Sequence, residues 1–284
     1  MRKTLLFVSL FAGFIIRLLS ASPETAFENL ARELESPNPA QRLEAVRKIA
    51  VDYTVEGQPY ILKAAGDRDE FVRERAVQGL GAGGGAKAVA ALKMALKDPD
   101  EFVRWRSVQA LDRLGVQDVI EELAPLIRDE SWRVKVSALE LLGNIGVRRM
   151  KRNPSELPGT TLDKRLKQIL LQGLEDPDER VRLSAAASLA RNKDGAAMAP
   201  LRDLLRNGSM FTRGSAGEAL GDLSDTRAVE SLIEALADPR NHVCEEGSDW
   251  ACWGAAKALT KLTGQNYGID VKKWREWSDS NLPK

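Results

Sequence analysis

The chain of 284 residues has the length of one large domain or two ordinary ones, and 43% apolar residues allow a sizeable buried core. Its 42 Lys and Arg side chains against 41 Asp and Glu leave a net charge of +1, which excludes the one-signed surface of a general nucleic-acid coat. One histidine and two cysteines exclude most multi-histidine metal sites and any disulfide-dense scaffold. We therefore expect no nucleic acid among the partners.

The first 22 residues differ from the rest of the chain. A basic start is followed by an uncharged, largely apolar run at 4–16 and then by small residues, a sequence typical of a secretory signal peptide. A bilayer span needs about 20 apolar residues, and Arg17 interrupts this run. Residues 1–22 therefore predict export to the periplasm or the cell exterior. An uncleaved membrane anchor formed by residues 4–19, the one expected route to a membrane, and a buried helix remain as alternatives.

A 31-residue period organises the chain after residue 23. The segment Asp67–Arg73 closely matches Asp98–Arg104 and Asp176–Arg182. Aligned on the residue before the basic side chain, the repeats follow one another at steps of 31, 31, 31, 47, 31 and 39 residues. The two longer steps indicate one insertion of 16 residues and one of 8. The anchor positions are Gln41, Val72, Val103, Val134, Val181, Thr212 and Ala251.

Each repeat has the pattern of two helices joined by a turn. Apolar residues recur at spacings of four, as in Val72, Ala76 and Leu80, which is the stripe of an amphipathic helix. The turn carries aspartates that are well placed to cap the second helix. Glycines just past the second stripe predict left-handed helix ends; they are Gly81, Gly143 and Gly221.

One helix pair cannot bury its own apolar faces, so the pairs must stack on one another. The sequence therefore predicts an all-α solenoid of about seven helix–turn–helix repeats over residues 23–264. The end repeat needs a cover, which residues 265–284 supply as a C-terminal cap with Trp274 and Trp277 on one helical face. An exposed aromatic binding site at these two tryptophans is the alternative.

The pattern Asp-x-Asp-x-x-Val-Arg-x-x-Ala-x-x-x-Leu resembles the HEAT repeat in its short bacterial form, the bilin-lyase-type HEAT-like repeat, over about residues 24–264. This resemblance implies a ladder of contacts between turn aspartates and basic residues of successive repeats. Ser36 and Asn207 replace the aspartate and Cys252 replaces the basic residue, so the ladder is expected to weaken at both ends. The matching positions are Asp67, Arg73, Asp98, Arg104, Asp129, Lys135, Asp176, Arg182, Arg213 and Asp238.

Motifs that carry catalysis are not evident in the sequence. The glycine-rich run 81–86 imitates a dinucleotide-binding loop but follows a predicted helix instead of a strand. Ser215 lacks the first glycine of a nucleophile elbow, and the paired His-Glu motifs of dinuclear-metal HEAT enzymes are absent. We expect a non-catalytic protein without a cofactor. The rival is an enzyme-associated or lyase-like protein that handles a chromophore or another small ligand, which a visible absorbance band would favour.

The two insertions are candidate functional segments. The first, Val147–Thr161, predicts a surface loop whose basic cluster meets an acidic partner or a phosphate, or else a solvated loop without a role. Its basic residues are Arg148, Arg149, Lys151 and Arg152. The second insertion places Cys244 and Cys252 close together, which in an exported protein predicts a disulfide. A metal site that includes His242, and two independent thiols, remain open.

The second helices also predict a binding groove. Positions two, three and six after the anchor lie off the core stripe, and exposed Trp and Arg side chains are typical of interface hot spots. The candidates are Arg75, Gln78, Trp105, Arg106 and Gln109. Burial of Trp105 against a neighbouring helix is equally open. In HEAT-like solenoids this helix lines the curved face, so the resemblance implies a scaffold that binds a protein or peptide there.

Overall fold

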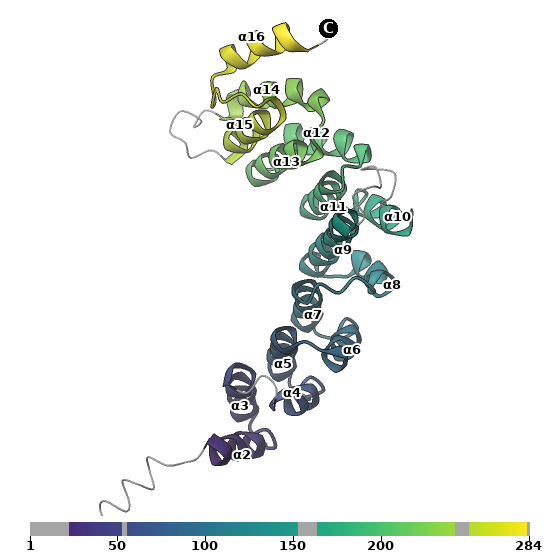
Figure 1. Ribbon diagram of the computed structural model, residues 1–284, viewed down its shortest axis with the longest axis vertical. Helices are drawn as coiled ribbons and strands as arrows, with labels where there is room; N and C mark the ends of the chain where they lie inside the picture. The colour runs from purple at the N-terminus through teal and green to yellow at the C-terminus, as the bar shows by residue number, and fades with distance from the viewer. Residues whose placement is uncertain (1–22, 53–55, 153–163, 242–249, 283–284) are drawn as a thin grey trace, which may run out of the picture. The chain divides into compact units, whose positions relative to one another are not determined.

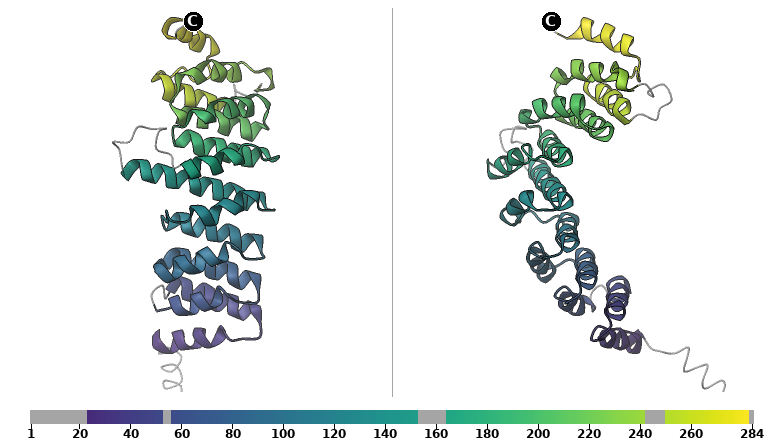
Figure 2. Two further views of the ribbon diagram at one scale, coloured as in Figure 1. Left: turned by 90° about the vertical axis from the view of Figure 1, so that its right-hand side faces the viewer. Right: turned by 180° about the vertical axis from the view of Figure 1, so that it is seen from behind.

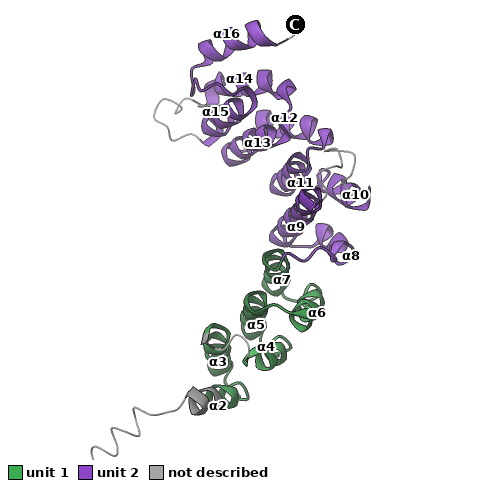
Figure 3. Ribbon diagram, viewed as in Figure 1, with its two compact units in different colours: residues 1–114 green, residues 115–284 purple. Residues whose placement is uncertain are grey.

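A computed structural model describes residues 23–52, 56–152, 164–241 and 250–282. The chain divides into two compact units, residues 1–114 and 115–284 (Figure 3). The described residues contain helices and no strands, so the predicted all-α class is confirmed. Within each unit, consecutive helix pairs stack as layers (Figure 2).

Unit 1 contains the first repeats. Its helices are α2 (Pro23–Glu33), α3 (Pro39–Asp52), α4 (Gln58–Ala64), α5 (Glu70–Gly83), α6 (Ala86–Ala95) and α7 (Glu101–Arg113). The second helices of the repeats, α3, α5 and α7, pack side by side in one row, and α4 and α6 form the row of first helices beside them (Figure 1).

Unit 2 continues the same alternation. Its first helices are α8 (Ile120–Leu123), α10 (Lys164–Gly173), α12 (Met198–Asn207) and α14 (Val229–Leu236), with short 3-10 turns at Ala124–Arg128, Gly195–Ala197, Thr226–Ala228 and Pro239–Asn241. Its second helices are α9 (Trp132–Arg152), α11 (Glu179–Arg191), α13 (Met210–Leu223) and α15 (Trp250–Thr263), and α16 (Val271–Asn281) follows them.

The repeat columns form the core of both units. The residues four and eight positions after each anchor are all buried, with at most 2% of each side chain exposed. The small column is Ala45, Ala76, Ser107, Ala138, Ala185, Ala216 and Ala255, and the large column is Ile49, Leu80, Leu111, Leu142, Leu189, Leu220 and Leu259. Small residues at the first column let neighbouring helices approach, and the large residues of the second fill the space between them.

The turn aspartates cap the second helices as expected. The second aspartate of each turn has an extended backbone, and its carboxylate accepts hydrogen bonds from N–H groups of the first helical turn. Asp69, Asp100 and Asp178 play this part. The first aspartate accepts the N–H of the second, as Asp67 does from Asp69 at 2.9 Å. The turn therefore fixes where each second helix begins.

The glycines past the second stripe do not end their helices. Gly81, Gly143 and Gly221 lie inside α5, α9 and α13. A Cβ atom at Gly81 would lie 2.7 Å from the Ala110 Cβ, and one at Gly143 would lie 2.6 Å from Ser188. The predicted left-handed ends were wrong at these positions because close packing against the next second helix, and not a turn, requires glycine.

The C-terminal cap is present as predicted. Trp274 of α16 is completely buried, and its indole Nε1–H donates to the Gly268 carbonyl at 2.8 Å. The Tyr267 ring meets it edge to face, with ring centroids 4.9 Å apart. Trp277 is half-buried. Helix α16 packs on α14 and so covers the apolar face of the last repeat.

Across the described ranges, no helix combines the length and the apolar character that crossing a membrane requires. The apolar run at 4–16 lies outside the described residues.

Candidate functional site

The basic residue after each anchor ties neighbouring repeats together. In unit 1, Arg73 donates from Nε and Nη2 to the Asp98 carboxylate at 2.8 and 2.9 Å, while its Nη1 reaches the carbonyl oxygen of Asp67 at 2.9 Å. Only 13% and 9% of the two side chains are exposed. The hydrogen bond that Arg73 donates to the Asp98 carboxylate raises the pKa of Arg73. A buried bidentate pair of this kind fixes the orientation of two packed elements.

The ladder begins earlier than the sequence indicated. Arg42 forms the same fork on Asp67, at 2.8 and 2.7 Å, even though Ser36 replaces the aspartate of its own turn. The expectation of a weak N-terminal end was wrong, because the arginine of one repeat pairs with the aspartate of the next. Ser36 still contributes to this contact, because its backbone carbonyl oxygen accepts a hydrogen bond from Arg42 at 2.9 Å.

Unit 2 contains two further contacts of this type. Lys135 pairs with Asp176 at 2.7 Å, and Arg213 pairs with Asp238 at 3.1 Å. Arg240 also donates to Asp238, and this hydrogen bond lowers the pKa of Asp238 to about 2, with the charge of Arg213 adding to the effect.

Three other ladder positions also form hydrogen bonds within their own turns. Arg182 donates to the carbonyl oxygens of Asp176 and Pro177, each at 2.9 Å. Arg104 does the same with Asp98 and Pro99. The Asp129 carboxylate accepts from the backbone N–H of Ser131 at 2.9 Å.

The predicted groove residues of unit 1 do come together. Arg106 donates to Glu74 of the preceding second helix at 3.0 Å and to Gln109 at 3.1 Å. Its guanidinium carbon lies 4.3 Å from the centroid of the Trp105 ring, a cation–π arrangement. Trp105 is half-buried and meets the Phe102 ring edge to face at 6.5 Å. Trp105 is therefore partly exposed, as an interface residue would be, and partly buried, as in the alternative that packs it against its neighbours.

Two exposed phenylalanines and a second arginine extend this surface. Phe71 and Phe102 stand directly before their anchors and are 60% and 41% exposed. Arg75 donates to the Gln78 side chain, and its Nε atom is buried without a hydrogen-bond partner. We call this surface the unit 1 face, and its members are Phe71, Glu74, Arg75, Gln78, Phe102, Trp105, Arg106 and Gln109. The sequence analysis missed both phenylalanines, although large apolar residues off the core stripe were a usable signal.

The basic cluster of the first insertion lies on a helix. Helix α9 continues to Arg152, so Arg148, Arg149, Lys151 and Arg152 occupy its last turns and not a loop. Arg and Lys are good helix formers, and their positive charges suit the negative end of the helix dipole. Arg149 donates to the carbonyl oxygen of Gln117 at 3.5 Å. Residues 153–163 lie outside the described residues.

One of the two cysteines lies within the described residues. Cys252 is buried in α15 and is disulfide-bonded, so the described residues contain no free cysteine. Cys244 and His242 lie outside the described residues, and the pairing of Cys244 with Cys252 stays a prediction. No group of three or more His, Cys, Asp or Glu side chains within the described ranges is arranged to hold a metal ion.

A second aromatic surface lies in unit 2, at positions that the sequence analysis did not select. Phe211 of α13 stacks on Trp250 of α15, with ring centroids 6.2 Å apart and an interplanar angle of 15°. Trp250 in turn contacts Trp253 at 5.5 Å. The three side chains are 61%, 42% and 50% exposed. We call them the aromatic cluster.

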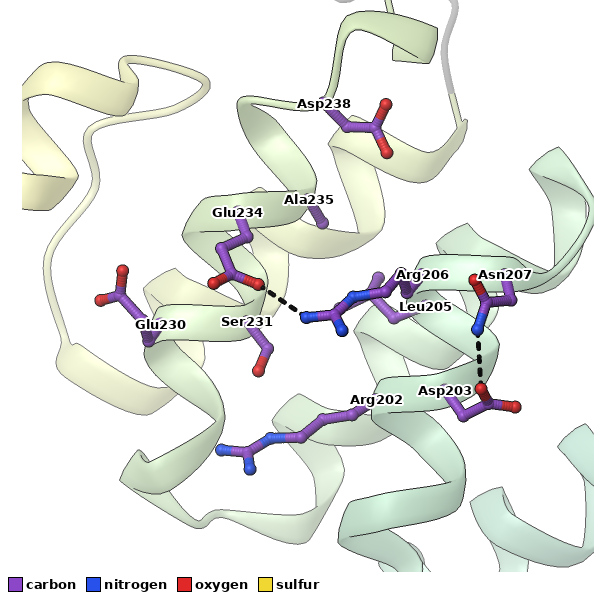
Figure 4. Close-up of a pocket in the computed structure, with 10 residues that line it drawn as sticks. All are labelled: Arg202, Asp203, Leu205, Arg206, Asn207, Glu230, Ser231, Glu234, Ala235 and Asp238. Carbon is purple, nitrogen blue, oxygen red and sulfur yellow. Dashed lines mark hydrogen bonds and ion pairs between the residues drawn. The ribbon is translucent and has the colours of Figure 1, made fainter.

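Charged residues line a groove between α12 and α14, with a volume of about 520 Å³ (Figure 4). Arg206 pairs with Glu234 at 3.2 Å across it, and Asn207 donates to Asp203 at 2.7 Å. Arg202 donates to the Arg227 carbonyl oxygen. Side chains of both signs line the groove, so it presents no one-signed field that would select a charged ligand.

These features agree with what sequence comparison finds. Residues 27–112, 94–158 and 168–252 match the model of the HEAT repeats family. The chain belongs to the HEAT-repeat family. No curated protein matches it.

Three solved structures match most of this chain in a structural comparison. The complex of CpcE and CpcF of phycocyanin lyase from Nostoc sp. PCC7120 is 21% identical, with coverage of 86% of this HEAT-repeat chain and 97% of the other and a TM-score of 0.48. An engineered protein is 18% identical, with coverage of 91% and 74% and a TM-score of 0.49. Computationally designed armadillo repeat proteins for modular peptide recognition are 19% identical, with coverage of 68% and 98% and a TM-score of 0.44.

Proposed function

We propose that this HEAT-repeat protein is a non-catalytic scaffold that binds a protein or peptide segment on the unit 1 face. The observation that carries the proposal is the Trp105–Arg106 pair, which is partly open to solvent and held in place by Glu74 and Gln109. Trp and Arg are the residue types on which interface binding energy concentrates. Because Arg106 is already oriented, little side-chain entropy remains to be lost on binding.

The exposed phenylalanines support the same surface. Phe71 and Phe102 occupy one repeat position in adjacent repeats, so the spacing of packed helices, about 10 Å, separates them. A peptide in the polyproline II conformation advances about 3.1 Å per residue with three residues per turn. Side chains three residues apart on such a peptide point the same way and could therefore contact both rings. A segment bound in this way crosses the second helices in the direction in which the repeats stack.

The experiment selects random dodecapeptides from a displayed library on the full-length protein. The face variant Trp105→Ala/Arg106→Glu is the comparison, and Met94→Ala/Lys97→Glu is the matched control, because it removes an exposed apolar residue and reverses a charge at the other row of unit 1. Selected peptides should bind the face variant about tenfold more weakly, the cost expected when hot-spot residues are lost. The control should bind within about twofold of the unsubstituted protein.

Peptides that bind the face variant as tightly as the unsubstituted protein would contradict the proposal for this surface. Failure to enrich any peptide would contradict the function as a whole.

We also propose that the protein is exported. The support is the sequence of residues 1–22, with its basic start, apolar run and small residues. Mass spectrometry of the protein recovered from separated cell fractions should find a chain that begins near residue 22 outside the cytoplasm. An intact N-terminus in the soluble cytoplasmic fraction would contradict export.

A further inference from the structure

Backbone contact between α13 and α15 creates the aromatic cluster of unit 2. A Cβ atom at Gly214 would lie 2.5 Å from the Trp250 carbonyl oxygen, and one at Gly254 would collide with the Gly214 carbonyl oxygen. The two helices therefore touch backbone to backbone where their N-terminal turns meet. This approach brings Phe211 and Trp250 into ring-to-ring contact.

The aromatic cluster is an exposed apolar patch. Phe211, Trp250 and Trp253 all keep more than two fifths of their surface in contact with solvent. Contiguous exposed apolar surface of this kind marks interaction sites in soluble proteins. The Lys257 ammonium lies 4.6 Å from the Trp253 ring centroid and 3.0 Å from Glu218. A positive charge therefore already borders the cluster, which disfavours a cationic ligand.

Further lysines lie beyond the cluster, toward the C-terminal end of α15 and in the turn after α11. The Asp222 carboxylate pairs with the Lys261 ammonium at 2.6 Å. The backbone carbonyl oxygen of Asp222 accepts a hydrogen bond from Lys193. Burial and the charge of Lys261 lower the pKa of Lys193. We call Lys193, Lys257 and Lys261 the basic end; these three cations lie beside two carboxylates, those of Glu218 and Asp222.

We infer that unit 2 binds an acidic peptide segment that carries an aromatic residue. The aromatic side chain lies on the cluster, and the carboxylates lie beside the basic end, where they offset its excess positive charge. Trp253 and Lys261 are eight residues apart on α15, which is about 12 Å along the helix. An extended peptide covers that distance in about four residues. Side chains on one face of an extended peptide are an even number of residues apart, so the expected ligand has an acidic residue four positions from an aromatic one.

This inference rests on the proposed function, since it requires that the protein binds peptides, but it concerns a different surface. The same library selection tests it with separate variants. Trp253→Ala removes an exposed ring, and Lys257→Gln/Lys261→Gln removes two charges without adding any. Lys272→Gln on α16 is the matched control, because Lys272 is exposed and belongs to neither surface.

A peptide subset rich in Asp, Glu and aromatic residues should be enriched on the full-length protein. Measured by fluorescence anisotropy, these peptides should bind Trp253→Ala about tenfold more weakly and the double lysine variant about fivefold more weakly. The Lys272→Gln control should bind as the unsubstituted protein does. Raising the salt concentration should weaken binding of the acidic peptides, because their charges are solvent-accessible.

Three results would overturn the inference. One is that the enriched peptides are basic or uncharged. Another is that every enriched peptide depends on Trp105 and Arg106 and none on Trp253, in which case the proposed function stands and only the unit 2 site fails. The third is self-association that Trp253→Ala abolishes in sedimentation velocity, which would assign the cluster to a second copy of this chain.

Discussion

The second helices of unit 1 and unit 2 carry aromatic residues at the same repeat positions, yet these residues are arranged differently. In unit 1, Trp105 stands two positions after its anchor and lies beneath the guanidinium of Arg106. In unit 2, Gly214 occupies the same position, and the next second helix packs directly onto it. Trp250 is thereby brought against Phe211, and Trp253 remains exposed. The repeat position decides which side chains face solvent, while the size of one residue decides how closely the helices approach and what the aromatic rings contact.

The largest expected effect is the loss of that close approach. Gly214→Ala places a Cβ atom 2.5 Å from the Trp250 carbonyl oxygen and against its ring, so α13 and α15 must separate. We expect the free energy of unfolding to fall by about 3 kcal/mol, the upper range for overpacking. Thermal and denaturant unfolding of the variant and the unsubstituted protein measure this change in free energy.

Gly195→Ala is the matched control, since an added Cβ atom there would meet nothing within 4 Å. It should change stability by less than about 0.5 kcal/mol. If Gly214→Ala is equally neutral, the backbone contact does not hold the two helices.

A smaller effect is expected from the ladder of unit 1. Arg73→Ala leaves the Asp98 carboxylate without its bidentate partner and frees the carbonyl oxygen of Asp67. This change should lower the free energy of unfolding by about 2 kcal/mol, less than for a fully buried pair because both side chains keep some contact with water.

Arg165→Ala provides the comparison for an exposed pair. Arg165 and Glu121 also form a bidentate contact, at 2.9 and 3.0 Å, but both are largely exposed. Its loss should leave the free energy of unfolding almost unchanged, because solvent screens an exposed pair. If Arg73→Ala and Arg165→Ala lower the free energy of unfolding equally, the buried ladder contact stabilises the protein no more than an exposed ion pair does.

The smallest effect concerns acid pH in unit 2. Hydrogen bonding from Arg240, together with Arg213, lowers the pKa of Asp238 to about 2 in the folded protein, below its ordinary value of 3.8. The resulting stabilisation is therefore complete above about pH 4 and is lost as the pH falls through 2. Melting temperatures between pH 5 and pH 2 should fall less steeply for Asp238→Asn than for the unsubstituted protein. A slope that Asp238→Asn leaves unchanged would show that Asp238 contributes nothing to acid sensitivity.

The repeat arithmetic predicted what depends on local pattern. The 31-residue period located the buried columns, and the Asp-containing turns located the starts of α5, α7 and α11. The role of Gly81 and its equivalents was missed, because a helix end and a close helix contact both require glycine. The continuation of α9 to Arg152 was missed since an insertion says nothing of its own conformation.

The site was predictable only in part for a related reason. The Arg42–Asp67 contact joins two successive repeats. The turn at Ser36, which lacks the aspartate, therefore gives no indication of it. Phe211 and Trp250 stand 39 residues apart in the sequence, with an insertion between them, and their stacking depends on the distance between α13 and α15. Contacts of this kind follow from packing, which one sequence does not specify.

The most direct test of the account measures binding and stability on one variant. Trp105→Ala/Arg106→Glu should bind a selected peptide about tenfold more weakly, while its melting temperature stays within about 2 °C of that of the unsubstituted protein. This result would show that the unit 1 face binds peptides and is dispensable for folding. A collapse of the melting temperature, or unchanged peptide affinity, would contradict the account.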